Sequence, residues 1–353
     1  MRIAQVTPRY HPYIGGIETY VREVSEKLVK KGFNVEILTT DPSGNLPKDE
    51  TINGVHVKRF KSWAPGEAYY FSRDLKKYLA ENSKGYDIVH AHNYHALPAL
   101  YAAQTKASNR LFFSPYYHAA GHTFFRSLLH ILYRYVGRRI FEKADKVICI
   151  SDYEKGLIVN HFQLNDEKIV IIPGGVNLED FKSLKKRKKN LRTILYVGRL
   201  EKYKGVQYLI KAMPKLDDDI ILEIVGKGSY RKSLIKLTKK LNMQGRVRFC
   251  HDLSREELLQ KYMDANVFVM LSKHESYCIS VAEALASRIP CIVANTSALK
   301  QWIDNKNCFG INYPIEITEL TNLINKVICM RVKDIRLHRW EEVMLRLVRL
   351  YEN

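Results

Sequence analysis

The sequence predicts an α/β protein with two doubly wound, parallel-sheet domains. Short runs rich in β-branched residues alternate with helical patterns along the whole chain, which is typical of βα units. The length of 353 residues fits two domains of roughly 100–200 residues each. Because 46% of the residues are hydrophobic, the chain can bury two cores and differs from disordered or fibrous proteins.

The first series of elements opens with a strand from Arg2 to Thr7 and a helix from Gly16 to Lys31, whose apolar residues recur on one face. Further strands of this series are expected at residues 33–39, 87–90, 110–115, 146–151 and 168–172. These elements predict a first domain over residues 1–180.

A second βα series begins after residues 182–192, which hold seven Lys and Arg and no acid and therefore indicate a solvated linker. The second domain is expected over residues 181–335, and a C-terminal helix within residues 336–353 could pack back on the first domain. In doubly wound sheets ligands bind at the carboxyl ends of the strands, so the cleft between the domains is the expected site. Strands of the second series are predicted at residues 193–198, 220–225, 246–249, 266–271 and 289–294.

The composition limits which cellular compartments and which classes of binding partner are expected for this protein. No apolar run approaches the roughly 18 residues of a membrane span, and the first residues do not form a signal peptide. The six cysteines are scattered without a Cys-x-x-Cys pair, which favours a reducing cytoplasm and argues against a zinc ribbon. The net charge of +20 allows nucleic acid, an anionic membrane or phosphate ligands as partners.

A glycine pair, Gly15-Gly16, follows the first strand and opens the first helix. Glycine there lets a ligand approach the backbone, and a helix N-terminus favours an anion, although such a pair is as often only a turn. No Gly-x-Gly-x-x-Gly motif is present, which counts against a nicotinamide or flavin enzyme.

A cationic pair, Arg199 and Lys204, is expected at the mouth of the cleft. Arg199 follows a predicted strand, and Lys204 stands at the entry to the next helix. A guanidinium offers a planar fork to phosphate oxygens and an ammonium a compact charge, so the pair could hold a diphosphate. The alternative is that both are solvated surface cations.

Two carboxylates, Glu275 and Glu283, are spaced across a loop and about two turns of the following helix. They could reach along one extended ligand, and carboxylates suit the vicinal hydroxyls of sugars and ribose. The alternative makes Glu275 a helix-start acid and Glu283 a surface residue. Small apolar residues surround Glu283 closely, which disfavours a wholly exposed helix face.

Two further clusters are interpreted as structural. Asp217-Asp218-Asp219 matches the Asp-x-Asp pattern of metal-dependent sugar transferases, but it lies between a helix and a strand, where acids cap turns. His90, His92 and His95 alternate at a strand end without a Cys or carboxylate that would complete a metal site. We therefore expect no metal cofactor.

Several motifs follow one another in a single order along essentially the whole chain. They are Gly15-Gly16-x-Glu18, Pro173-Gly174-Gly175-Val176-Asn177, Gly198-Arg199-Leu200 with Lys204-Gly205, Val225-Gly226-x-Gly228, and Glu275-x7-Glu283 with Ala284-x-Ala286 and Pro290. This combination resembles the retaining glycosyltransferases of family 4, which have the GT-B fold.

The resemblance implies a donor site in the second domain. Arg199 and Lys204 would bind the donor diphosphate, Glu283 the nucleotide ribose, and Glu275 hydroxyls of the transferred sugar as part of the catalytic centre. No cofactor other than the nucleotide-diphosphate sugar as co-substrate is implied. The backbone positions expected to face the donor are those of Gly16, Cys278 and Ile279.

The resemblance also implies an active-site histidine in the first, acceptor-side domain. His118 is the first choice and His122 the second, because the local alignment of Tyr116 to His122 is not unique. A single histidine is more often structural, so this assignment depends on the resemblance.

Three positions depart from the family's pattern. Cys278 stands where the family has the second glycine of Gly-Phe-Gly, Arg288 replaces a usual glycine, and Ser297-Ala298 replaces a common glycine pair. A side chain at Cys278 could crowd the sugar if the backbone must come close to it, which would change donor choice or lower activity.

The predicted function is transfer of a sugar from a nucleotide-diphosphate sugar to a glycan, lipid-linked or small-molecule acceptor, without metal and, as the resemblance implies, with retention. The alternative is a catalytically weak nucleotide-sugar-binding protein of the same fold. No nucleic-acid module is present, so nucleic acid is not an expected partner.

The charge is concentrated in the second half of the chain. Residues 1–180 contain 24 Lys and Arg against 19 Asp and Glu, whereas residues 181–353 contain 33 against 18. This asymmetry fits an anionic donor. A basic amphipathic segment over residues 124–141 could rest on an anionic membrane, although its apolar residues could equally belong to the core. We expect a cytoplasmic protein, which is peripheral at the inner face of the membrane if this segment binds lipid.

Overall fold

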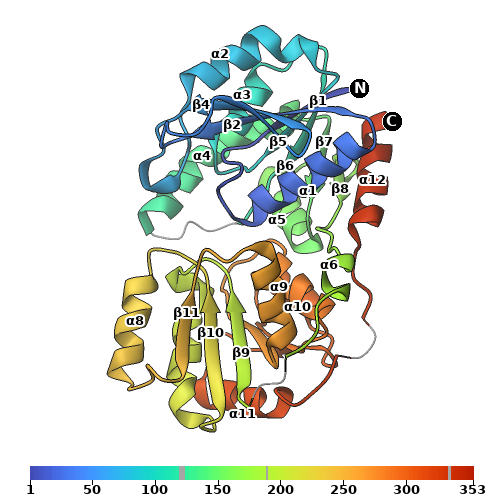
Figure 1. The fold of residues 1–353 in the computed structure, drawn as a ribbon. Helices are drawn as coiled ribbons and strands as arrows, with labels where there is room; N and C mark the ends of the chain where they lie inside the picture. Colours follow the sequence, from blue (N-terminus) through green and yellow to red (C-terminus); the bar gives the residue numbers. More distant parts are fainter. Residues whose placement is uncertain (119–123, 188–189, 333–334) are drawn as a thin grey trace. The chain divides into compact units, whose positions relative to one another are not determined.

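A computed structural model describes residues 1–118, 124–187, 190–332 and 335–353, including their side chains outside residues 124–132. Contacts divide the chain into two compact units (Figure 1). Unit 1 comprises Met1–Gly174 and Glu341–Asn353, and unit 2 comprises Gly175–Trp340. The sequence places the corresponding boundaries at residues 180 and 335.

Unit 1 is built on an eight-stranded sheet in the order β3-β4-β2-β1-β5-β6-β7-β8. All neighbouring strands run parallel except β3, which pairs antiparallel with β4. The strands are β1 (Arg2–Val6), β2 (Asn34–Asp41), β3 (Asp49–Ile52), β4 (Val55–Lys61), β5 (Ile88–His92), β6 (Arg110–Ser114), β7 (Lys146–Cys149) and β8 (Ile169–Ile171). The helices are α1 (Gly16–Lys30), α2 (Arg73–Asn82), α3 (Leu97–Gln104), α4 (Phe124–Lys143), α5 (Asp152–Phe162) and α12 (Trp340–Glu352).

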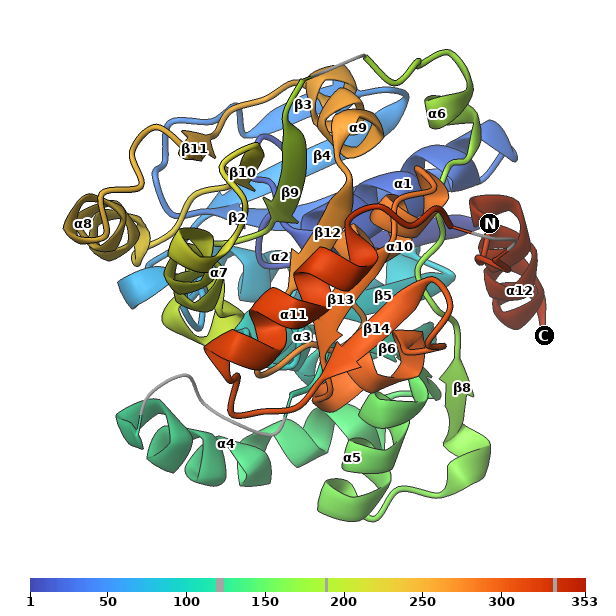
Figure 2. The ribbon, with the colours of Figure 1, turned by 90° about the horizontal axis from the view of Figure 1, so that it is seen from below.

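Unit 2 has a six-stranded, fully parallel sheet in the order β11-β10-β9-β12-β13-β14. Helices α7, α8 and α11 lie together along one face of it, and α9 and α10 cover the other (Figures 1 and 2). The strands are β9 (Arg192–Val197), β10 (Ile220–Val225), β11 (Val247–Cys250), β12 (Val267–Met270), β13 (Cys291–Ala294) and β14 (Cys308–Ile311). The helices are α6 (Glu179–Lys182), α7 (Val206–Ala212), α8 (Arg231–Lys240), α9 (Arg255–Asp264), α10 (Ile279–Ala286) and α11 (Ile317–Val327).

The two doubly wound parallel sheets confirm the predicted fold class. The β3–β4 hairpin was missed, although its turn, Asn53-Gly54, has two positive φ angles and is a strong hairpin signal. Strand β14 was also missed, and a short 3₁₀ helix, η6 (Ser297–Trp302), precedes it. None of the described helices is long and apolar enough to cross a membrane.

Lys182, Lys185, Lys186 and Arg187 of the expected linker are exposed, as predicted, but the segment belongs to unit 2 and is bonded to it. The Lys186 ammonium donates to the carbonyl of Ala265 at 2.8 Å, and the Arg187 backbone N–H donates to Asp264 Oδ1 at 3.0 Å. These bonds anchor the segment at the end of α9. The positive charge therefore does not keep the whole segment away from the domain.

Two buried histidines of β5 join α12 to the sheet of unit 1. His90 Nδ1 lies 2.5 Å from the Tyr351 hydroxyl of α12, and His90 Nε2 lies 2.8 Å from Ser114 Oγ. His92 Nε2 pairs with Gln5 Oε1 at 2.7 Å. Burial lowers the pKa of His90 to about 3 and that of His92 well below its usual value, so both rings are neutral. Their role is structural.

Replacing Tyr351 with Phe tests this connection. The substitution keeps the ring but leaves the buried His90 Nδ1 without its partner, and we expect a loss of about 1–2 kcal/mol in the free energy of unfolding of unit 1. The control is Tyr135→Phe, because the Tyr135 side chain is 79% exposed. Thermal unfolding of both variants measures the effect, and equal melting temperatures would contradict it.

Candidate functional site

Glycines bring two loops together at the carboxyl edge of the unit 2 sheet. Gly205, with φ of +80°, packs so closely on the end of β12 that a Cβ would lie 2.3 Å from the Leu271 carbonyl oxygen. Gly226 has φ of +148°, and a Cβ there would lie 2.0 Å from the Gly198 carbonyl oxygen. Only glycine fits these positions. The close packing at Gly205 carries Lys204 to the loop that follows β12.

An ion pair joins the two loops. Lys204 Nζ lies 2.5 Å from Glu275 Oε1, and the side chains are only 12% and 13% exposed. Burial lowers the pKa of Lys204, but attraction to the Glu275 carboxylate outweighs it, and the pKa is raised overall. Lys204 is therefore a charged group inside the site, and its reading as a solvated surface cation is wrong.

The loop that carries Glu275 is held by η6. Ser297 Oγ accepts from the Glu275 backbone N–H at 3.0 Å, and the Ala298 N–H donates to the Glu275 carbonyl at 3.2 Å. Trp302 Nε1 donates to the Tyr277 carbonyl at 2.7 Å. Sequence reasoning did not find the positioning roles of Ser297 and Trp302, because their partners are backbone atoms of another loop.

Glu283 lies on the buried face of α10 and is 8% exposed, so its reading as a surface residue is wrong. It forms an ion pair with Arg255 at the start of α9, and Arg255 also lies 3.5 Å from Asp180. The sequence did not point to Arg255. The Ser254-x-x-Glu257 capping box, present in the structure, fixes the start of α9 and so places that guanidinium.

Cys278 is the N-cap of α10, and Ile279 is its first residue. Cys278 is buried with the hydrophobic core of unit 2. Burial raises the pKa of its thiol to about 12, so the thiol remains protonated and is a poor nucleophile at neutral pH.

Arg199 is exposed just beyond β9 and is connected to the ion pair through Tyr203. Its Nη2 donates to the Tyr203 hydroxyl at 3.2 Å, and Lys204 Nζ lies 5.3 Å from the centre of the same ring. The buried Tyr196 hydroxyl donates to the Arg199 carbonyl at 2.8 Å and fixes the turn. Arg199 and Lys204, the two residues expected to bind the diphosphate, thus lie close together on one short segment.

In unit 1 the glycine pair meets a buried carboxylate. A Cβ at Gly15 would lie 2.3 Å from Glu18 Oε2, whereas Gly16 has open space at that position. Glu18 is held by Arg9, whose Nε donates to Glu18 Oε1 at 3.0 Å. A side chain at Gly15 would therefore displace the Glu18 carboxylate from its place beside Arg9, and the open space at Gly16 leaves room for the expected ligand.

His118 follows β6, and its Nδ1 lies 2.9 Å from His95 Nε2. One of these nitrogens must donate and the other accept, so His95 sets the tautomer of His118. The Glu154 carboxylate accepts from the backbone N–H of the neighbouring Tyr117. Sequence reasoning missed His95 as a partner, and the alternative His122 lies outside the described residues.

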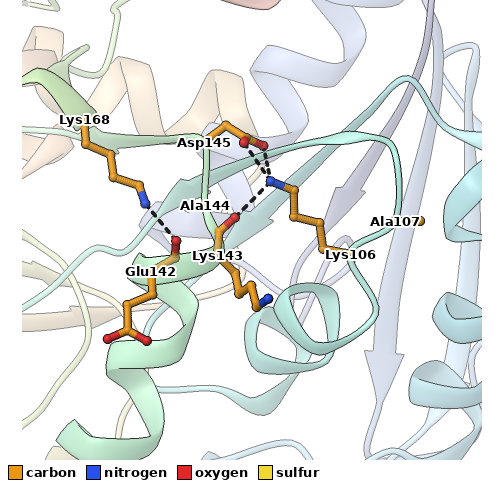
Figure 3. A pocket seen from close by; sticks show the side chains of 7 residues that line it. All are labelled: Lys106, Ala107, Glu142, Lys143, Ala144, Asp145 and Lys168. Atoms are coloured by element: carbon orange, nitrogen blue, oxygen red, sulfur yellow. Dashed lines mark hydrogen bonds and ion pairs between the residues drawn. The ribbon is translucent and has the colours of Figure 1, made fainter.

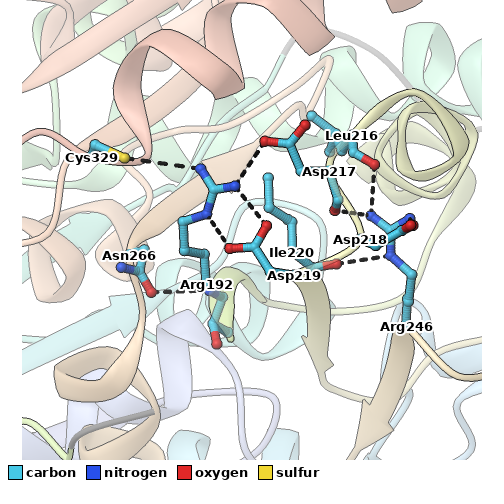
Figure 4. Close-up of polar contacts among 10 residues, drawn as sticks. Arg192, Leu216, Asp217, Asp218, Asp219, Ile220, Arg246, Asn266 and Cys329 are labelled. Atoms are coloured by element: carbon cyan, nitrogen blue, oxygen red, sulfur yellow. Dashed lines mark hydrogen bonds and ion pairs between the residues drawn. The ribbon is translucent and has the colours of Figure 1, made fainter. Parts of the chain in front are cut away.

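The aspartate run does not resemble a metal site. Arg192 donates to Asp217 and Asp219, with three bonds of 2.6–2.8 Å, and Arg246 donates to Asp218 at 3.0 Å (Figure 4). These carboxylates lie at the amino ends of β9 and β10 and neutralise arginines. Among the described residues, no group of His, Cys, Asp and Glu side chains could hold a metal ion.

A hollow of about 580 Å³ lies at the amino-terminal edge of the unit 1 sheet (Figure 3). Lys106 donates to both oxygens of Asp145 at 2.7 Å, and Lys168 donates to the Glu142 carbonyl at 2.9 Å. These cations are already partnered within the protein. The hollow also lies at the opposite edge of the sheet from His118, so it does not carry the site.

Known proteins resemble both units. The family model "Glycosyltransferase Family 4" matches residues 14–180, and "Glycosyl transferases group 1" matches residues 177–342. Sucrose-phosphate synthase from Thermosynechococcus elongatus superposes with a TM-score of 0.83 at 22% identity, covering 99% of this chain and 98% of that one. The chain belongs to the GT-B glycosyltransferases.

Two relatives of this glycosyltransferase and one further solved structure extend the comparison. An uncharacterized glycosyltransferase of Methanocaldococcus jannaschii is 29% identical over 87% of this chain and 83% of its own length. The alpha-monoglucosyldiacylglycerol synthase of Streptococcus pneumoniae is 27% identical over 89% and 75%. Anabaena HepE, solved in complex with UDP-glucose, has a TM-score of 0.81 at 15% identity and covers 99% or more of both chains.

The three departures from the family's pattern share one conformation in this glycosyltransferase. Cys278, Arg288 and Ser297 have φ angles of +80°, +62° and +46°, in the left-handed region that glycine adopts without strain. At Arg288 the N–H bonds to the Leu285 carbonyl and the next N–H to Ala284, which is the Schellman ending of α10. The backbone therefore keeps a glycine conformation where glycine is missing.

Replacing Arg288 with Gly tests this strain. The side chain is exposed, so removing it costs little, and relief of the left-handed conformation should raise the free energy of unfolding by roughly 0.5–1 kcal/mol. Arg288→Ala is the control, because it removes the same side chain and keeps the strain. Thermal unfolding compares them; a gain in both variants, or in neither, would contradict the explanation.

Proposed function

We propose that this glycosyltransferase moves a sugar from a nucleotide-diphosphate sugar to a glycan, lipid-linked or small-molecule acceptor, with retention and without a metal. One observation carries the proposal: the nearly buried Lys204–Glu275 pair at the carboxyl edge of the unit 2 sheet. Two charges are kept there at a desolvation cost. A donor with an anionic diphosphate and a hydroxylated sugar would satisfy both.

Donor binding follows from the chemistry of each group. Lys204 and Arg199 would neutralise the diphosphate, and the backbone N–H groups at the start of α10, near Ile279, add the positive end of the helix dipole. Glu283 would accept from the ribose hydroxyls and Glu275 from those of the sugar. A protein of the same fold supports this proposal, since Anabaena HepE was solved with UDP and with UDP-glucose.

The same groups would stabilise the transition state. As the bond to the sugar breaks, negative charge grows on the leaving diphosphate, where Lys204 and Arg199 act in place of a metal. Glu275, the carboxylate assigned to the sugar, is used to bind sugar hydroxyls once Lys204 turns to the diphosphate, so it is not assigned as a covalent nucleophile. Departure and attack on one face then give retention.

His118 is the proposed catalytic group of unit 1. Its Nδ1 is engaged by His95, and its Nε2 is the nitrogen proposed to contact substrate. If His95 donates this bond, His118 Nε2 carries a proton and donates to substrate; if His118 donates, its Nε2 is a base. His95 is therefore a positioning residue for His118.

A catalytically weak binding protein is the second candidate, suggested by Cys278. Because Cys278 is buried with the core, its side chain exposes little surface that could crowd a sugar. This burial favours the enzyme.

Contact with an anionic membrane is proposed for α4. The side chains of residues 124–132 lie outside the described part of the chain. Beyond them Tyr135 and Val136 are exposed hydrophobic residues, and Arg138 and Arg139 are exposed cations. Apolar and cationic groups that share one helix in this way suit an anionic lipid surface.

The test is a thermal-shift screen over nucleotides and nucleotide sugars, followed by turnover of the donor that stabilises the protein most. Lys204→Ala should lower kcat/KM for that donor by about 10²–10³, because a charge that faces the leaving group is lost. Lys202→Ala is the matched control, since Lys202 is exposed on the same turn.

Equal turnover by Lys204→Ala and the wild type would overturn the donor assignment. Stabilisation by a nucleotide sugar that is never hydrolysed or transferred would favour the binding protein. No thermal shift with any nucleotide would contradict both candidates.

A further inference from the structure

Two aromatic side chains of unit 1 are exposed side by side. Trp63 is 67% exposed and Phe71 is 44% exposed, and their ring centroids lie 5.4 Å apart with planes inclined by 36°. They stand at the two ends of residues 63–71, here called the aromatic hairpin, which follows β4. Adjacent exposed aromatic rings are costly in water and commonly mark a binding surface.

The aromatic hairpin holds its rings in place. The Trp63 N–H donates to the Phe71 carbonyl and the Phe71 N–H donates to the Trp63 carbonyl, both at 2.9 Å. Tyr69 packs beside Phe71, with ring centroids 6.3 Å apart. A ligand that lies on these rings would not have to order them first, which lowers the entropy cost of binding.

Contacts connect the aromatic hairpin to the candidate catalytic histidines. The Leu97 N–H donates to the Tyr69 carbonyl at 2.8 Å, and Tyr69 forms a parallel bridge with Ala96. The residue before Ala96 is His95, the partner of His118. The hairpin also leaves the carboxyl end of β4, at the edge of the sheet where ligands of doubly wound domains bind.

Polar groups accompany the rings. Glu67, near the tip of the hairpin, is 74% exposed and accepts from Arg9 Nη1 at 3.1 Å. Arg9 is also bonded to Glu18 at the start of α1. The surface therefore offers two aromatic faces together with a carboxylate and a guanidinium, which accept from and donate to hydroxyl groups.

From this arrangement we propose that the aromatic hairpin binds a sugar ring of a glycan acceptor. One face of a pyranose is lined by C–H groups and packs on aromatic rings, while its rim of hydroxyls bonds to groups such as Glu67 and Arg9. A lipid chain would use only the rings, and Glu67 would be repelled by an anionic lipid surface. The inference rests on the proposed function and specifies its acceptor as a glycan.

Tryptophan fluorescence tests the proposal directly. The chain has three tryptophans, and the other two, Trp302 and Trp340, are partly or fully buried, so a ligand on the hairpin should change mainly the emission of Trp63. The probes are maltotriose, chitotriose and mannotriose, titrated into the full chain. We expect a saturable change with at least one of them, lost in Trp63→Ala and weakened at least fivefold in Phe71→Ala.

Two controls keep the result interpretable. Tyr135→Ala removes another exposed aromatic ring of unit 1 and should leave the titration unchanged. Trp63→Phe keeps a ring, so saccharide binding, measured for this variant by calorimetry, should be partly retained.

The proposal is overturned if no saccharide changes the emission, if the change persists in Trp63→Ala, or if Trp63→Ala loses only its binding to phosphatidylglycerol vesicles. The donor-induced thermal shift, measured on the same variants, should be unchanged. If the wild type shows no donor-induced thermal shift, the proposed function is contradicted but saccharide binding is not. Failure of the proposed function and failure of the saccharide proposal can therefore be distinguished.

Discussion

The ion pair between Lys204 and Glu275 is the interaction on which the rest of the donor-side geometry depends. Removing two charges from water is expensive, and the pair persists because each group neutralises the other. Its position is set by backbone packing, since Gly205 seats the Lys204 turn on the end of β12. Its orientation is set by η6, which holds both backbone groups of Glu275.

Under the proposed function, the same constraint predicts that the site selects one kind of ligand. A neutral ligand would leave one or both charges buried without a partner. A ligand with negative charge at one end and hydroxyls at the other can replace the internal pair group by group. Arg255 and Glu283 form a second such pair between α9 and α10, and its carboxylate is the one proposed to bind the ribose.

The fold was largely predictable because alternating βα periodicity is a local property of the sequence. Arg199, Lys204 and Glu275 could be proposed as site residues because they lie beyond the ends of predicted strands, and Glu283 because it follows Glu275 by eight residues on the next helix. Their partners could not be found, since Arg255 and the 3₁₀ helix that holds Glu275 meet them only through the fold.

The left-handed backbone conformations are a second feature that could not be predicted from the sequence. The sequence shows that glycine is absent at Cys278, Arg288 and Ser297, but not that the backbone conformation remains. The linker illustrates a further limit. Its charge predicted the exposure of its lysine and arginine residues, but not the bonds of Lys186 and Arg187 to the end of α9.

The most direct test of this account is the affinity of the Glu275→Gln variant for the nucleoside diphosphate that stabilises the wild type most, measured by isothermal titration calorimetry. If the carboxylate competes with the diphosphate for Lys204, its neutralisation should tighten binding of the sugar-free nucleotide several-fold, while the advantage of the nucleotide sugar over that nucleotide should fall. Weaker binding of the sugar-free nucleotide would contradict the central claim that Lys204 exchanges Glu275 for the donor.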